Sequence, residues 1–163
     1  IVLLQKFFIE QSTGSPQRKV NEYKKLQAMV DYSHTTRCLR KFILEYFGEE
    51  NVQEECDNCS NCNDESELVD ITIEAQKIFS CIFRMKERYG TSLIADVLRG
   101  SKNKKVLELG FDKLSTYGII KQYTIKEIRD IINVLTAEEY LSLADGQFPV
   151  VHLKDKAVAV LKN

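Results

Sequence analysis

Several features that would assign the chain to a class of protein are missing from its sequence. It has no signal peptide and no apolar run long enough to span a membrane, so we expect neither secretion nor contact with a membrane. It also has no phosphate-binding Gly-Lys-Ser/Thr loop and no acidic Mg²⁺-binding motif, so we expect no ATP hydrolysis by this chain alone. The first residue is Ile1 rather than Met, which suggests a fragment of a longer protein.

The composition is that of a globular protein whose charge is unevenly distributed. Hydrophobic residues make up 44% of the 163 residues and charged residues 29%, which suits one domain or two small ones. Residues 45–74 contain eleven acidic residues and neither Lys nor Arg, whereas residues 84–129 contain eleven basic residues against five acidic ones. The basic excess suggests a polyanionic partner for the second half, with a solvated basic face as the alternative.

Four of the five cysteines lie within twenty-five residues. Cys38 is followed by a C-x-x-C-x-x-C run formed by Cys56, Cys59 and Cys62. Two-residue spacers let neighbouring thiolates converge on one small tetrahedral cation, and four sulfur ligands leave no open coordination position. The pattern therefore predicts structural Zn²⁺. The fifth cysteine, Cys81, lies in an apolar helical pattern and is expected in the core.

The same cysteines allow three other interpretations. Two disulfides would need an oxidising compartment, which nothing in the sequence indicates. A ferredoxin-type run usually ends in Cys-Pro, whereas Asn63 follows Cys62 here. A redox C-x-x-C would follow a strand of a βαβ unit, and none is predicted. His34 is close enough in sequence to be a substitute ligand, although an exposed loop histidine is the preferred interpretation.

The first sixty residues predict a helical hairpin and a third helix. An apolar segment, 1–10, precedes Ser15 and Pro16, which suit the N-cap and N1 positions of a helix running from Gln17 to about Asp31. The third helix is expected to begin at the N-cap Thr36 and to end at Gly48. It would place Cys38 in its first turn, where the helix N-terminus favours a thiolate. Nearby cations are expected to offset the charge of the metal centre: Arg37, Arg40 and Lys41.

The second half predicts helices followed by a β-hairpin. The expected elements are helices over 72–89, 92–98, about 106–109 and 125–135, strands over 140–143 and 150–153 around an Asp145-Gly146 turn, and a final helix over about 155–161. This order is that of a winged helix. The predicted fold class is mainly α with a small β-hairpin. We expect a helical zinc-binding subdomain at 1–66 and a winged-helix domain at 67–163, separated by a polar stretch at 63–67.

Three motifs resemble one known family. Residues 37–49 together with Cys56–Cys62 are similar to the zinc-binding subdomain of RecQ DNA helicases. Residues 96–101 and the stretch 110–118 are similar to that family's winged helix, including its G-H-D-K-L-S-x-Y-G motif. The resemblance covers nearly the whole chain, and its proportions are bacterial. Two positions depart from the family: Phe111 replaces a His, and Ile120 replaces a common Gly.

The resemblance implies a parent protein that is an ATP-dependent 3′-to-5′ DNA helicase acting in replication, recombination and repair. ATP and Mg²⁺ would be bound only by its helicase core, which would be a partner of this region within the same chain. The protein would be cytoplasmic and associated with the nucleoid. The winged helix would bind duplex or forked DNA through its phosphates. The candidate DNA-binding residues are Arg99, Ser101, Lys102, Lys104, Lys105, Lys113, Ser115, Tyr117, Lys121, Lys126 and Arg129.

Two other functions remain open at the level of the sequence. A zinc-containing transcription regulator would need base-contacting Arg, Asn or Gln at the start of its recognition helix, and residues 124–127 offer few. A winged helix can also serve as a module that docks proteins. Protein partners of the winged helix are therefore an alternative to DNA.

Overall fold

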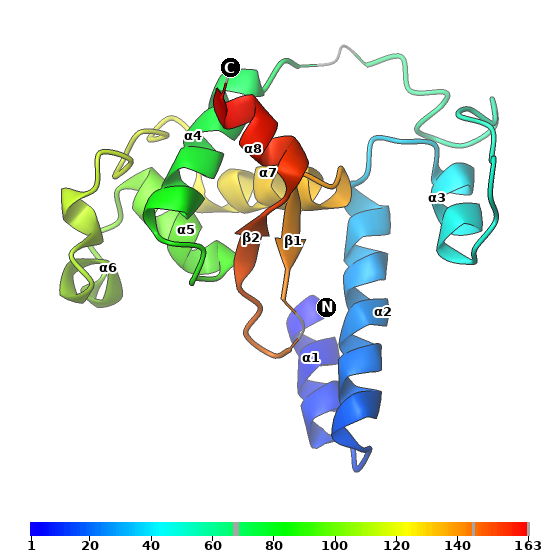
Figure 1. Cartoon of the computed structure of the whole chain (residues 1–163), viewed down its shortest axis with the longest axis horizontal. Coiled ribbons are helices and arrows are strands. Elements are labelled where there is room, and N and C mark those ends of the chain that lie inside the picture. Colours follow the sequence, from blue (N-terminus) through cyan, green and yellow to red (C-terminus); the bar gives the residue numbers. More distant parts are fainter. Residues whose placement is uncertain (67–68, 145, 163) are drawn as a thin grey trace.

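A computed structural model of the chain describes residues 1–66, 69–144 and 146–162. These residues form eight α-helices, one short 3₁₀ helix and one two-stranded antiparallel sheet. The predicted fold class, mainly α with a small β-hairpin, is confirmed. Figure 1 places the N-terminal helices α1 to α3 on one side of the molecule and α6 at the opposite end. None of the helices within the described ranges combines the length and apolar character of a membrane span.

The chain begins with a helical hairpin. Helix α1 spans Val2–Gln11 and packs against α2, which spans Pro16–His34. As predicted, Ser15 is the N-cap of α2, and its side chain accepts a hydrogen bond from the N–H of Arg18 at 3.3 Å. His34 is the last residue of α2 and is half-buried, so its expected place in an exposed loop is wrong.

Helix α3 is shorter than predicted. It spans Leu39–Tyr46, and its N-cap is Cys38 rather than Thr36. The capping hydroxyl of Thr36 is directed elsewhere, because both it and the Thr36 N–H donate to the carboxylate of Glu138, at 3.1 and 2.8 Å. Gly48 has a φ of +88° just after the helix, which is the left-handed C′ position that the sequence predicted.

The second half has the element order of a winged helix (Figure 1). Its elements are α4 Thr72–Arg84, α5 Thr91–Arg99, α6 Lys104–Glu108, η1 Phe111–Lys113, α7 Ile125–Ala137, β1 Leu141–Leu143, β2 Val151–Leu153 and α8 Asp155–Lys162. The strands pair with Ser142 opposite His152. Helix α7 starts in a full capping box, in which Thr124 and Glu127 each bond the other's backbone N–H.

Helix α4 ends five residues earlier than the apolar pattern suggests. The pattern runs to Tyr89, but Lys86 and Glu87 have positive φ values of 59° and 51°. Contacts with β2 explain this turn, because Glu87 Oε1 accepts from the N–H of Leu153 at 2.7 Å and the Tyr89 carbonyl accepts from Val151 at 3.0 Å. The strand therefore overrides the local helical preference. Asp145 of the predicted hairpin turn lies outside the described residues.

One hydrophobic core lies inside the winged helix. The largest fully buried side chains are Phe79, Ile78, Ile82, Met85, Ile94, Leu98, Ile120, Ile128, Ile132 and Leu141. The ring of Phe79 stacks on Tyr140 with centroids 5.9 Å apart. Cys81 is fully buried, as predicted. Phe111 packs edge-on against Tyr89 with ring centroids 5.0 Å apart, and both side chains lie against this core.

Candidate metal centre and basic surface

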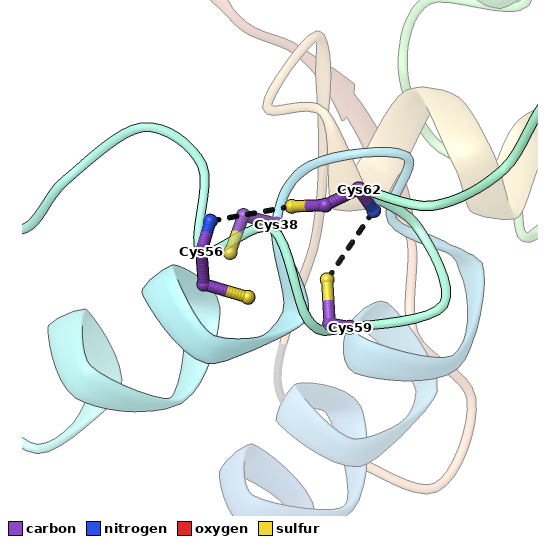
Figure 2. A group of neighbouring side chains, drawn as sticks. All are labelled: Cys38, Cys56, Cys59 and Cys62. Atoms are coloured by element: carbon purple, nitrogen blue, oxygen red, sulfur yellow. Dashed lines mark hydrogen bonds between the residues drawn. The ribbon is translucent and has the colours of Figure 1, made fainter.

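The four clustered cysteines converge on one point (Figure 2). Their sulfur atoms all lie within 4.8 Å of one another. Cys38 is buried at the N-terminus of α3, while Cys56, Cys59 and Cys62 are half-buried in the loop 56–62, which we call the cysteine loop. None of the five cysteines forms a disulfide in this structure, and the convergence of four sulfurs on one point favours a shared ion over two disulfides.

The donor set fits zinc. Bonds of about 2.3 Å to a tetrahedral Zn²⁺ place its sulfur ligands about 3.8 Å from one another, within the spacing found here. Soft thiolates are ligands that Zn²⁺ prefers over hard oxygen donors. No βαβ unit precedes the loop among the described elements, so a thioredoxin-type redox site is not supported. When bound, the ion supplies a cross-link between α3 and the cysteine loop.

Backbone N–H groups point at the sulfurs. The N–H of Lys41 donates to Cys38 Sγ, that of Cys62 donates to Cys59 Sγ, and that of Cys56 donates to Cys62 Sγ, each at 3.4 Å. The first of these bonds is an N-cap interaction, so the helix terminus does favour the thiolate as predicted. Each of these N–H groups favours the thiolate form of the sulfur that it faces.

The thiol pKa values reflect these donors and the crowding of like charges. The N–H of Cys62 is the main cause that lowers the pKa of Cys59 to about 6. The N–H of Lys41 likewise lowers the pKa of Cys38. The N–H of Cys56 lowers the pKa of Cys62, but burial and the neighbouring Cys59 and Cys38 thiolates outweigh it and raise that pKa to about 12. A divalent cation held by these four sulfurs would favour the thiolate form of all of them.

Two of the cations near the cluster, Arg37 and Lys41, have carboxylate partners. Lys41 pairs with Glu54, and Arg37 Nη1 lies 3.5 Å from Glu45 Oε2. The expected offset of the thiolate charge by Arg37, Arg40 and Lys41 stays a prediction, and carboxylates of the same region share two of these cations. Asn61, which the sequence analysis missed, donates instead to the carbonyls of Thr35 and Arg37 at 2.8 Å. The only signal for Asn61 in the sequence was its position between the metal ligands Cys59 and Cys62.

Several candidate DNA-binding residues gather where α5 ends. Gly100 and Gly118 have φ values of +80° and +68°, and their backbones touch, since a Cβ on Gly100 would lie 3.1 Å from Gly118 Cα. The side chain of Lys121 lies over both glycines. Arg99 Nη1 donates to the Lys121 carbonyl. Arg99, Gly100, Ser101, Gly118 and Lys121 form what we call the α5 corner.

Other candidates flank this corner. Lys102, Lys104, Lys105, Lys113 and Ser115 are exposed on and around α6 and η1. Tyr117 is half-buried, and its hydroxyl donates to the carbonyls of Gly100 and Ser101 at 3.0 and 3.3 Å. The hydroxyl of Tyr117 therefore holds the corner together from within.

The remaining two candidates lie on α7. Lys126 is exposed in its first turn. Arg129 lines a cavity of about 260 Å³ between the helical hairpin and the wing, together with Lys6 and His34. Burial lowers the pKa of Lys6, which the sequence analysis did not single out. The predicted basic residues therefore do not form one surface. Most lie at or beside the α5 corner, whereas Arg129 lines the cavity beside the helical hairpin.

Fold and cysteine site together define a helical zinc-binding unit joined to a winged helix. Two family models match the chain in this order: "RecQ zinc-binding" over residues 2–63 and "RQC domain" over residues 65–163. The chain therefore belongs to the RecQ family, as a bacterial-type region that contains an RQC domain and a structural zinc-binding part.

Curated relatives agree with the family models. The chain is 48% identical to the "ATP-dependent DNA helicase RecQ" of Bacillus subtilis over 99% of its own length and 27% of the relative's. It is 33% identical to the protein of that name from Haemophilus influenzae (98% and 26%) and 37% identical to that from Pasteurella multocida (98% and 25%). The chain thus spans about a quarter of the length of these relatives. The regulator and docking-module alternatives are not favoured.

Proposed function

We propose that this region grips duplex DNA beside the fork in a RecQ-type 3′-to-5′ DNA helicase. The observation that carries the proposal is the α5 corner, where Arg99 and Lys121 are held side by side on a rigid backbone. Cationic side chains on a fixed frame bind backbone phosphates with little sequence readout. The exposed basic residues around α6 extend this surface, so the bound duplex would run along the end of the molecule occupied by α6.

The proposed metal ligands are Cys38, Cys56, Cys59 and Cys62. Their chemistry and convergence support a structural role, because a closed set of four thiolates offers no position for a substrate. They would tie the cysteine loop, which has few apolar residues of its own, to the start of α3. We retain 1–66 and 67–163 as the proposed boundaries of the zinc-binding and winged-helix units.

The helicase core of the same chain is the proposed partner of the helical hairpin. Helix α1 has no buried residue, and Leu3, Phe7 and Phe8 are 83%, 55% and 54% exposed. An apolar face of this kind normally marks an interaction surface. About three quarters of the length of the relatives lies outside the matched region. This additional part of the chain is the proposed occupant of the apolar face of α1. In the parent helicase this contact would connect the ATP-driven motor with the DNA held by the winged helix.

Fluorescence anisotropy with forked, duplex and sequence-scrambled DNA tests the proposed DNA role. We expect similar affinities for scrambled sequences and a steep fall in affinity with salt. Replacing Lys121 by Ala should lower the slope of log K against log [salt] by about 0.9 if one phosphate contact is lost. Lys25→Ala is the matched control, because Lys25 is exposed on α2 and pairs with Glu22.

The possible outcomes separate the proposed function from its alternatives. A slope that falls for Lys121→Ala but not for Lys25→Ala supports phosphate binding at the α5 corner. One strongly preferred sequence would support a transcription regulator instead. Equal slopes for both variants and the parent chain would refute the proposed surface.

A further inference from the structure

The segment that joins α2 to α3 is held from the side of the metal centre. This segment, residues 35–37, leads directly into Cys38. Asn61 of the cysteine loop donates its Nδ2 to the carbonyl oxygens of Thr35 and Arg37, both at 2.8 Å. Because one amide spans both carbonyls, the conformation of the cysteine loop fixes the path of the segment.

The same segment is held from the opposite side by the winged helix. Glu138 is the C-cap residue of α7. Its Oε1 accepts from Thr35 Oγ1 at 2.9 Å, from the Thr36 N–H at 2.8 Å and from Thr36 Oγ1 at 3.1 Å. Its Oε2 lies 3.7 Å from Arg37 Nε. Every side-chain partner of Glu138 that the structure describes therefore comes from this one segment.

Glu138 is itself fixed within the winged helix. The side chain of Lys156 in α8 donates to the Glu138 carbonyl at 3.0 Å and lies 4.1 Å from the centre of the Tyr140 ring. The carboxylate is only 18% exposed. Hydrogen bonds to a shielded carboxylate are stronger than those between neutral groups, and loss of the acceptor would leave the Thr36 N–H without its partner. This contact is therefore a tight link between the two halves.

We propose that Asn61 and Glu138 couple the metal centre to the placement of the winged helix, with residues 35–37 as the shared element. The proposal rests on the metal ligands assigned under the proposed function. An ordered cysteine loop presents Asn61 to the carbonyls of the segment. The segment then directs its Thr35 and Thr36 donors at Glu138. Glu138 is thus a positioning residue, which sets where the winged helix stands relative to the zinc-binding unit.

Reciprocal measurements test this coupling. If metal binding and the Glu138 contact stabilise each other, each must strengthen the other by the same factor, because coupling free energy is symmetric. Zinc affinity is measured by competition with a chromogenic chelator. The Glu138 contact is measured by hydrogen exchange at the Thr36 amide, with and without zinc. Both measurements use the 163-residue chain.

Two variants break the link and two matched controls do not. Glu138→Gln keeps the shape but removes the charge, and Asn61→Ala removes the amide. The control for the first is Glu139→Gln, whose exposed carboxylate pairs with Lys154 at 3.6 Å. The control for the second is Asn58→Ala, an exposed position in the same cysteine loop. Circular dichroism confirms that the helices of each variant remain folded.

We expect Glu138→Gln and Asn61→Ala each to weaken zinc affinity about tenfold, while both controls match the parent chain. Zinc removal should speed exchange at the Thr36 amide by a similar factor in the parent chain and not in Asn61→Ala. Faster exchange in Glu138→Gln with unchanged zinc affinity would overturn the coupling. If the parent chain binds no stoichiometric zinc, or Cys59→Ser retains it, the ligand assignment itself is wrong, which is a different result.

Discussion

Replacing Gly100 with alanine tests whether the α5 corner depends on two backbones in contact. Gly100 has a φ of +80°, in the left-handed region, and a Cβ there would lie 3.1 Å from the Cα of Gly118. That atom belongs to the backbone and cannot rotate away. Two hydrogen bonds hold the two segments together, from the Gly118 N–H to Val97 O at 2.9 Å and from the Ile120 N–H to Leu98 O at 3.1 Å.

The expected cost has two parts. An alanine in the left-handed conformation costs about 1 kcal/mol or slightly more. Forcing a methyl group into a packed contact adds about 1–3 kcal/mol. The free energy of unfolding should therefore fall by about 2–4 kcal/mol in Gly100→Ala. Gly110→Ala separates the two parts, because Gly110 has a φ of +70° but nothing within 4 Å of its Cβ position, so it should lose only about 1 kcal/mol.

Urea unfolding of both variants, followed by circular dichroism, measures this difference. Hydrogen exchange at the Gly118 and Ile120 amides provides a local readout, and it should accelerate in Gly100→Ala alone. Equal losses of stability in the two variants would refute the reasoning, since they would mean that the segment after Gly118 moves aside at no cost. In that case the rigid placement of Arg99 and Lys121 would not hold either.

Three further predictions concern the metal centre and the core. Cys59→Ser should lose zinc and unfold the first unit while the winged helix survives, as metal analysis and circular dichroism will show, and full zinc content would contradict the ligand set. Phe79→Ala should lower the free energy of unfolding by about 3–5 kcal/mol in urea titrations, because Phe79 is fully buried. Burial raises the pKa of Cys81 to about 11 from 9.0, so the unfolded thiol ionises first, and stability should fall as pH rises from 9 towards 11. Cys81→Ala should make the fall in stability over this pH range smaller.

Local signals in the sequence were sufficient for most of the elements. Ser15 and Thr124 predicted the starts of α2 and α7, because a capping side chain acts on N–H groups only two or three residues away. The spacing of the four cysteines predicted their convergence for a similar reason, since two-residue spacers restrict where neighbouring thiolates can point. The apolar stripe of α7 likewise matched its buried face, which includes Ile128 and Ile132.

The errors arise where a distant residue decides the local structure. Thr36 is a good N-cap by type, but its hydroxyl and N–H both donate to Glu138, more than one hundred residues away, and the helix starts after Cys38 instead. The apolar pattern of α4 continues to Tyr89, but pairing with β2 ends the helix at Arg84. Among the basic residues, charge alone could not separate the α5 corner from Arg129, because that separation depends on how α2 packs against α7.

The two halves are stabilised by different forces, and this difference has a consequence for how they respond to perturbation. The winged helix has its own apolar core, which includes Phe79, Leu98 and Ile132, whereas Cys38 and Tyr23 are the only buried apolar residues among the described residues before position 67. Removal of zinc by a chelator should therefore destabilise the zinc-binding unit first and leave the core of the winged helix intact. The effect can still reach the winged helix, because residues 35–37 contact both the cysteine loop and Glu138. Loss of metal would then change where the proposed DNA-binding surface stands without unfolding the winged helix.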